Sequence, residues 1–220
     1  AKTNVSIIKS VTESIMKYAE NPLIIVVSNP ADILTMEVQK VSGLPAQRVI
    51  GSGTSLDTAR FRCNISEPLD ADVEDVQAYI LGEHGDSQVP VWSSATIAGL
   101  PLDEYLKQTG KELDRAEISE HTKTGGAEVI ELKGATFYGV AMAVSAIVES
   151  ILKNSGAILP VAHVLDDSFD NWSGIAFSLP CRIGGQGIQG VLRVPMNEEE
   201  KAAMDNSAKI LKDFWAQVNE

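Results

Sequence analysis

The sequence predicts an α/β protein built in two parts, and three observations lead there. The continuous apolar run Leu23–Val27 is typical of a buried strand in a parallel sheet. A helix beginning at Pro30 follows it, so strand and helix form half of a βαβ unit. After Val49–Gly51 the predicted helices and strands come in mixed order, which indicates a second part of the α+β class.

In the first part, apolar residues at helical spacing predict an amphipathic helix that precedes the strand, with a face formed by Val5, Ile8, Val11, Ile15 and Tyr18. Asn29 is expected to cap the next helix, which Pro30 begins and which ends near Val41.

In the second part, Ser55 is expected to cap a helix that runs through Arg60. The patterns further predict strands at Val76–Leu81, Ile158–Val164 and Ile175–Cys181, and long helices at Asp114–Leu132 and Ala135–Lys153. Asn197 should cap a final helix with a core-facing stripe made of Met204, Ala208, Leu211, Trp215 and Val218. The glycine-rich segment 184–187 is interpreted as a turn rather than a phosphate cradle, and the charged stretch 111–123 as a solvated helix face.

The composition limits the kinds of molecule that we expect this chain to bind. The chain has 220 residues, 44% of them hydrophobic, and a net charge of -12 without a basic cluster, so we expect neither nucleic acid nor an anionic membrane as a partner. No apolar run approaches the ~20 residues of a membrane span, and no secretory pattern opens the sequence. Cys63 and Cys181 are expected to be inert buried thiols in a cytoplasmic protein, and no residue cluster has metal-ligand spacing.

Two short segments, 55–60 and 82–87, carry the candidate chemistry. Asp57 and Arg60 are three residues apart and share one face of the predicted helix, while His84 lies between glycines just after a strand. A guanidinium, a carboxylate and an imidazole can together hold an organic acid and move a proton. From the residues alone, Asp57 and Arg60 could equally form a surface ion pair, and a single histidine is more often structural.

Several segments together resemble a known family: Ser28-Asn29-Pro30, the run from Val49 to Thr54, the two segments above, Val89–Trp92 and Lys133–Gly139. They are similar to the 2-hydroxy-acid dehydrogenases of the L-lactate and malate dehydrogenase group. Glu83, Trp92 and Thr136 resemble the L-lactate branch. The resemblance implies that residues 1–52 are the end portion of a Rossmann-type parallel sheet domain that binds NAD, and that residues 53–220 form the substrate-binding and catalytic domain.

The resemblance also implies roles for single residues. Arg60 would anchor the substrate carboxylate, and His84 would be the acid and base, with Asp57 as its partner. Asn29 would contact both the nicotinamide and the substrate oxygen, Thr136 would lie beside the substrate, and Val140 would form an apolar wall against the ring. His121 and His163 match no motif and are expected to be structural.

Two features of the family pattern are not found in the sequence. No Gly-x-Gly-x-x-Gly turn lies between a strand and a helix near its start, and the family's loop with a carbonyl-polarising arginine is missing, so we expect a fragment that is inactive alone. The alternatives are a malate or other 2-hydroxy-acid dehydrogenase and a non-catalytic fragment or assembly module. The resemblance further implies a homo-oligomer, a tetramer, and an effector site in which Arg62 matches the family's arginine but Gln77 replaces its histidine.

Overall fold

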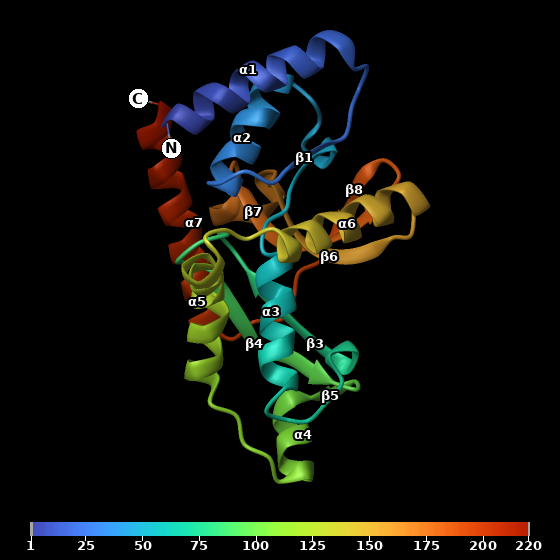
Figure 1. Cartoon of the computed structure of the whole chain (residues 1–220), viewed down its shortest axis with the longest axis vertical. Helices are drawn as coiled ribbons and strands as arrows, with labels where there is room; N and C mark the ends of the chain where they lie inside the picture. Colours follow the sequence, from blue (N-terminus) through green and yellow to red (C-terminus); the bar gives the residue numbers. More distant parts are fainter. Residues whose placement is uncertain (1, 220) are drawn as a thin grey trace.

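The computed structural model describes residues 2–219, which form two sheets with helices packed around them (Figure 1). The larger sheet has the strand order β1-β2-β6-β7-β8. Strands β1 (Ile24–Val26) and β2 (Val49–Gly51) are parallel, and β6 (Ala157–Val164), β7 (Ala176–Gly184) and β8 (Gly187–Val191) extend the sheet in antiparallel fashion. The predicted α/β class is thereby confirmed.

The sheet also crosses the predicted boundary between the two parts. Gly51 of β2 is paired with Ala162 of β6, so strands from residues 1–52 and 53–220 share one sheet. The division at residues 52 and 53 stays a prediction.

The smaller sheet is antiparallel and contains β3 (Val76–Leu81), β4 (Val89–Ile97) and β5 (Leu100–Pro101). It is tied to the larger sheet directly after β3, where the backbones of Gly82 and Ser178 exchange two hydrogen bonds of 3.1 and 3.0 Å. The end of β3 is therefore the junction of the two sheets.

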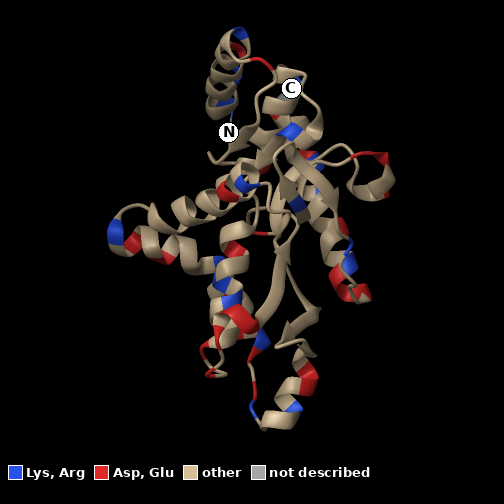
Figure 2. Ribbon diagram, turned by 90° about the vertical axis from the view of Figure 1, so that its right-hand side faces the viewer, with Lys and Arg blue, Asp and Glu red and all other residues tan. Residues whose placement is uncertain are grey.

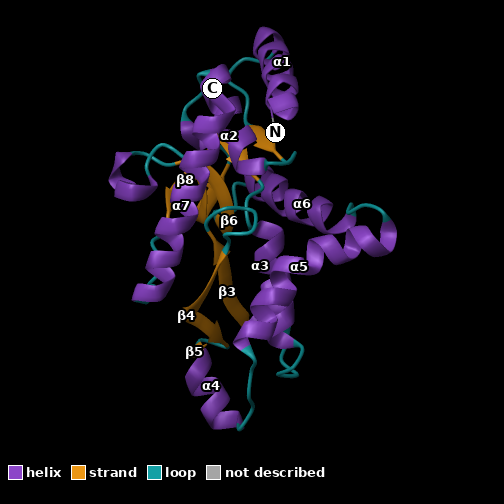
Figure 3. Cartoon of the chain, turned by 90° about the vertical axis from the view of Figure 1, so that its left-hand side faces the viewer, coloured by secondary structure: helices purple, strands orange, loops and turns teal. Residues whose placement is uncertain are grey.

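Seven α-helices are assigned in the described chain: α1 (Lys2–Tyr18), α2 (Ala31–Ser42), α3 (Ser55–Ser66), α4 (Leu102–Thr109), α5 (Arg115–Lys133), α6 (Tyr138–Lys153) and α7 (Glu198–Asn219). Short 3-10 turns occur at Ala46–Arg48, Val73–Asp75 and Asp167–Trp172. Helix α3 packs against β3, α5, α6 and β6, so it lies between the two sheets. The end of α5 and the start of α6 project from the body (Figure 3).

The largest cluster of buried side chains joins α2, the ends of β3 and β7, and α7, through residues such as Ile33, Leu81, Phe177 and Met204. A second cluster packs α3 and α5 against the smaller sheet, with Phe61 and Ile80 fully buried. Burial of apolar surface in these clusters fixes α2, α3 and α7 around the end of β3. None of the described helices is long and apolar enough to cross a membrane. Lys and Arg are interspersed with Asp and Glu along the ribbon (Figure 2).

The strands predicted at residues 23–27, 49–51, 76–81, 158–164 and 175–181 are all present, with ends that differ by at most three residues. The turn at 184–187 joins β7 to β8, as predicted. Asn197 caps α7 as expected, because its Oδ1 accepts a bond of 2.8 Å from the Glu200 amide while the Glu200 carboxylate accepts one of 3.0 Å from the Asn197 amide.

Two predicted caps are wrong. Helix α2 is preceded by Pro30 rather than capped by Asn29, because the Pro30 carbonyl already accepts the first helical bond, from Leu34. Ser55 lies inside α3, where its hydroxyl donates to the Pro160 carbonyl at 2.9 Å. A bond to a neighbouring strand thus takes the place of a bond within the helix.

Two burial predictions and one helix prediction also fail. Val11 and Tyr18 of α1 are exposed, because α1 packs on α2 through the side that carries Val5, Ile8 and Thr12. Cys63 is exposed rather than buried, since it lies on the outer face of α3, whereas Cys181 is buried as expected. In the charged stretch, residues 111–114 precede α5 and are not helical.

Candidate active site

His84 lies two residues beyond the junction of the two sheets, in the segment 82–88 that connects β3 to β4. Gly82 has a φ of +92°, and a Cβ there would come 2.9 Å from the Ser207 hydroxyl, so only glycine lets the chain turn this close to α7. The Ser207 hydroxyl accepts a bond of 3.1 Å from the Glu83 amide. The histidine is therefore held on a short, anchored connection.

The structure brings His84, Asp57 and Arg60 together, as predicted. Oδ2 of Asp57 lies 2.6 Å from Nδ1 of His84, and Oδ1 of the same carboxylate lies 3.4 Å from a guanidinium nitrogen of Arg60. The Asp57 side chain is 7% exposed, whereas those of His84 and Arg60 are about one-quarter exposed. One buried carboxylate thus bridges two cationic groups that remain accessible from a cavity.

The position of Asp57 beside His84 favours the positively charged form of the imidazole. Burial alone would lower the pKa of His84, but the hydrogen bond and negative charge of Asp57, together with the charge of Asp32, raise it above its ordinary value. The hydrogen bond to the Asp57 carboxylate occupies Nδ1, so Nε2 is the ring nitrogen left for proton exchange. His84 is consequently suited to donate a proton near neutral pH.

Two adjoining cavities meet at these residues, with volumes of about 550 and 300 Å³. Both are lined by Asn29, Arg60, His84 and Gly126. The larger also reaches Asp57, Lys123 and Phe214, while the smaller also reaches the apolar side chains of Leu56, Ile130 and Val140. A small charged molecule and a flat apolar ring could therefore be held side by side with His84 between them.

The remaining predicted site residues line the smaller cavity. Asn29 follows β1, Thr136 precedes α6, and Val140 lies in the first turn of α6. Val27, Ile130 and Ala143 complete an apolar wall around these polar groups. Such a cavity, with one amide at its edge, fits the nicotinamide ring of NAD and its carboxamide.

The proposed effector residues lie elsewhere. Arg62 is directed to the smaller sheet, where its Nε donates to the Ala78 carbonyl at 3.0 Å and its guanidinium stacks on Tyr79. Burial lowers the pKa of Arg62. Gln77 is exposed on β3. No described contact joins the two residues.

The two other histidines lie outside the two cavities. His163 is buried, and its burial lowers its pKa to about 4, which keeps it neutral. His121 is exposed on α5 near Asn64 and Glu67. In residues 2–219 no group of three or more His, Cys, Asp or Glu side chains is placed to hold a metal ion.

Sequence reasoning missed two residues that hold the His84 segment: Asp32 of α2 and Ser207 of α7. Asp32 accepts a hydrogen bond of 2.7 Å from the His84 backbone amide. The sequence does contain an indication of the role of Asp32, since it is a charged residue one position before an apolar helical run. Ser207 gave no such signal, because a serine in a long polar helix is unremarkable in sequence.

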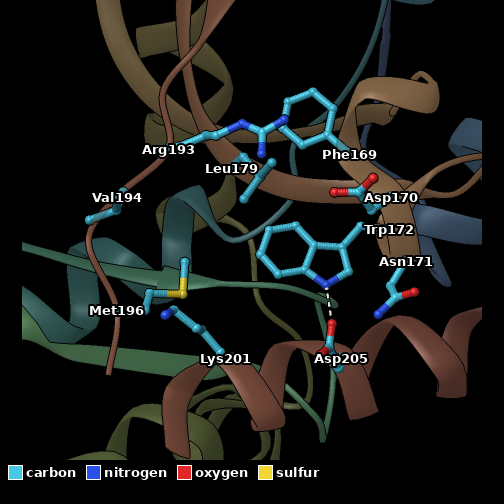
Figure 4. A pocket seen from close by; sticks show the side chains of 10 residues that line it. All are labelled: Phe169, Asp170, Asn171, Trp172, Leu179, Arg193, Val194, Met196, Lys201 and Asp205. Carbon is cyan, nitrogen blue, oxygen red and sulfur yellow. Dashed lines mark hydrogen bonds between the residues drawn. The ribbon is translucent and has the colours of Figure 1, made fainter. Parts of the chain in front are cut away.

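A further cavity, of about 270 Å³, lies away from His84 between the 3-10 turn at Asp167–Trp172 and the start of α7 (Figure 4). Figure 4 shows the indole of Trp172 at its centre, with Nε1 donating to Asp205. Arg193 stacks on Phe169, and Lys201 forms an ion pair with Glu198. Trp172, Arg193 and Lys201 thus each have a described partner.

Comparison with known proteins agrees with the geometry. A model of the lactate/malate dehydrogenase NAD-binding domain matches residues 1–51, and one of the α/β C-terminal domain of the same family matches residues 54–220. L-lactate dehydrogenases from Moorella thermoacetica and Kosmotoga olearia are 42% and 43% identical to the chain, which covers 69% and 67% of their lengths. The alignments include 98% and 96% of this chain.

Solved structures are similar over the whole chain. An L-lactate dehydrogenase from Clostridium thermocellum is 45% identical, with a TM-score of 0.90 over 100% of this chain and 73% of that one. A lactate dehydrogenase from a deep-sea metagenome library is 36% identical, with a TM-score of 0.97 over 100% of this chain and 70% of that one. The chain therefore belongs to the lactate/malate dehydrogenase family.

Proposed function

We propose that this chain is the catalytic portion of an NAD-dependent L-lactate dehydrogenase that interconverts L-lactate and pyruvate. The observation that carries the proposal is the Asp57 carboxylate, which bridges Arg60 and His84 at the boundary of two cavities. The relatives and solved structures quoted above are named as lactate dehydrogenases, which supports the same substrate pair here.

In the proposed reaction each residue has one task. The guanidinium of Arg60 binds the carboxylate of pyruvate through charge-assisted hydrogen bonds, which fixes the position of the adjacent carbonyl. Nε2 of the His84 imidazolium donates its proton to the carbonyl oxygen as that oxygen becomes a hydroxyl. Asp57 stabilises the imidazolium and fixes its orientation through Nδ1.

The smaller cavity supports the position of the cofactor. NADH, when bound, supplies the hydride that reaches the carbonyl carbon. Asn29 and Thr136, which line this cavity, would bind the carboxamide and orient the substrate, and Val140 with Ala143 would exclude water from one side of the ring. In the reverse direction His84 accepts the proton of the lactate hydroxyl.

The central test replaces His84 by Gln in the natural polypeptide that contains these 220 residues. We expect kcat for pyruvate reduction to fall by about 10²–10⁴-fold, the usual contribution of a general acid, with a much smaller change in KM. His163→Gln is the control, since His163 is buried and neutral outside both cavities. A His84→Gln enzyme with normal kcat would refute the assignment.

Two further measurements separate the proposal from its alternatives. Initial rates with pyruvate and oxaloacetate distinguish a lactate dehydrogenase from a malate dehydrogenase. Fluorescence titration of NADH into the 220-residue chain alone should give weak binding, because the sequence has no glycine-rich turn between a strand and a helix near its start. Micromolar binding by this chain would contradict that expectation.

We also propose a homo-oligomer, a tetramer by family resemblance, located in the cytoplasm. Leu132, Phe137, Tyr138 and Met142 are exposed on the projecting end of α5 and start of α6, and exposed apolar surface of this kind favours association. The free thiols of Cys63 and Cys181 suit a reducing compartment. Light scattering and cell fractionation test the two statements.

For regulation, we propose little activation by sugar bisphosphates. Gln77 lacks the positive charge that a strongly anionic effector requires, and the Arg62 guanidinium is engaged by β3. Adding fructose 1,6-bisphosphate should leave the KM for pyruvate within about two-fold at pH 6 and 7. A many-fold fall in KM would overturn this proposal.

A further inference from the structure

Asp32 is a buried acid beside the candidate active site that the mechanism above does not use. It lies in the first turn of α2, is 2% exposed, and is 52 residues from His84 in sequence. Its Oδ2 accepts the hydrogen bond of 2.7 Å from the His84 backbone amide, and its Oδ1 is buried without a hydrogen-bond partner among the described residues. Its one described bond is to the backbone of the histidine.

His84 is thereby held at two points by two carboxylates from two helices. Asp57 of α3 binds the imidazole, whereas Asp32 of α2 binds the backbone that carries it. The preceding amide, of Glu83, is bound by the Ser207 hydroxyl of α7. Three helices thus fix consecutive groups of this segment.

The carboxylate also acts on the imidazole through its charge. Asp32 is among the groups that raise the pKa of His84, after the bond and the charge of Asp57, while Arg60 lowers it. Lys123 and Asp86 also line the cavity that His84 faces. In return, burial raises the pKa of Asp32 to about 7, with the charges of Glu83 and Asp57 acting in the same direction and the His84 amide and charge opposing them.

A neutral side chain would satisfy the same hydrogen bond. An asparagine Oδ1 accepts from an amide and would carry no charge into the interior, so the hydrogen bond by itself does not require an acid. What an acid adds is a negative charge beside the histidine once the pH approaches its pKa of about 7.

We propose that Asp32 is a positioning residue for the proton-transfer step: it fixes the His84 backbone by a hydrogen bond and stabilises the imidazolium by its charge. The proposal rests on the role of His84 given above. Asp32 thus has two proposed tasks, to position the His84 backbone and to provide a negative charge, and two variants can distinguish them.

Asp32→Ala removes both the hydrogen-bond acceptor and the charge. Asp32→Asn removes the charge but keeps an acceptor for the His84 amide. Two readouts need neither substrate nor cofactor, so they do not depend on the proposed activity: the pH titration of the His84 ring proton by NMR, and the hydrogen exchange of the His84 amide. The matched control is Glu37→Gln, which removes a buried carboxylate from the same helix five residues further on, next to Lys40.

We expect both Asp32 variants to lower the pKa of His84 relative to the wild type and to Glu37→Gln. Amide exchange at His84 should accelerate at least ten-fold in Asp32→Ala and stay within three-fold in Asp32→Asn. In the natural enzyme, Asp32→Ala should lower kcat at least ten-fold with little change in KM, and Asp32→Asn should shift the pH profile of kcat/KM to lower pH.

An unshifted His84 titration in Asp32→Asn would overturn the proposal, whatever the fate of Asp32→Ala. A loss of thermal stability with the titration and exchange unchanged would also overturn it, because that result describes a merely structural residue. If the NMR changes occur but the enzyme shows no lactate dehydrogenase activity, the positioning of His84 stands and the proposed function falls.

Discussion

The buried carboxyl of Asp32 makes a quantitative prediction about stability. In the unfolded chain this group loses its proton near its ordinary pKa of 3.8, whereas in the folded protein burial raises the pKa to about 7. Between these values the folded state binds the extra proton, so the free energy of unfolding falls as the pH rises. Each pKa unit corresponds to about 1.4 kcal/mol, and full ionisation of Asp32 therefore costs the folded state about 4 kcal/mol.

Asp32→Asn removes this dependence, since an amide does not titrate. The variant also places an NH₂ group where Oδ1 has no described partner, at a cost of about 1–3 kcal/mol that is the same at every pH. We therefore expect the difference in unfolding free energy, variant minus wild type, to rise by about 4 kcal/mol between pH 4 and pH 8. The slope of this difference, rather than its absolute value, is the quantity predicted.

The assay is urea unfolding followed by circular dichroism at half-unit intervals from pH 4 to pH 8, for the wild type, Asp32→Asn and Glu37→Gln. Subtracting the Glu37→Gln curve corrects for the loss of a carboxylate from α2. A difference that stays constant across this range would refute the reasoning, because it would mean that Asp32 ionises in the folded protein as easily as in the unfolded chain.

Three other predictions concern the candidate site and its support. Asp57→Asn should lower the pH at which pyruvate reduction declines, because the bond and charge that raise the pKa of His84 are lost; an unmoved midpoint in the pH profile of kcat/KM contradicts this pairing. Arg60→Lys should raise the KM for pyruvate about 10–150-fold, equivalent to the 1.5–3 kcal/mol of a charge-assisted hydrogen bond, and a KM within about two-fold of the wild type would show that Arg60 does not bind the carboxylate. Gly53→Ala should destabilise the fold by about 2–5 kcal/mol. Gly53 has a φ of +52°, and an added Cβ would lie 2.7 Å from a backbone nitrogen of β6. An unchanged melting temperature would exclude this clash.

Local patterns in the sequence predicted the elements that depend on local chemistry. A continuous apolar run predicted β1, helical spacing and an Asn197 cap predicted α7, and glycines predicted the turn between β7 and β8. His84 was placed correctly because a glycine-flanked histidine followed a recognisable strand.

What the sequence did not predict depends on long-range packing. Strand β4 was missed because Pro90 and two serines interrupt its pattern, although Pro90 is tolerated within a nine-residue strand. The apolar residues Val11 and Tyr18 suggested a buried face on α1, but only tertiary contacts decide which side of a helix is covered. The link from Asp32 to His84 spans 52 residues, a distance at which no spacing rule applies.

The position of His84 next to the bond pair between Gly82 and Ser178 has a mechanical consequence. A small rotation of one sheet against the other would act on the backbone only two residues from the imidazole, with no intervening flexible loop to absorb it. The same movement would pull the Glu83 amide against the Ser207 hydroxyl of α7. Because His84 lies so close to the bonds that join the two sheets, any such rotation would change the angle of its ring.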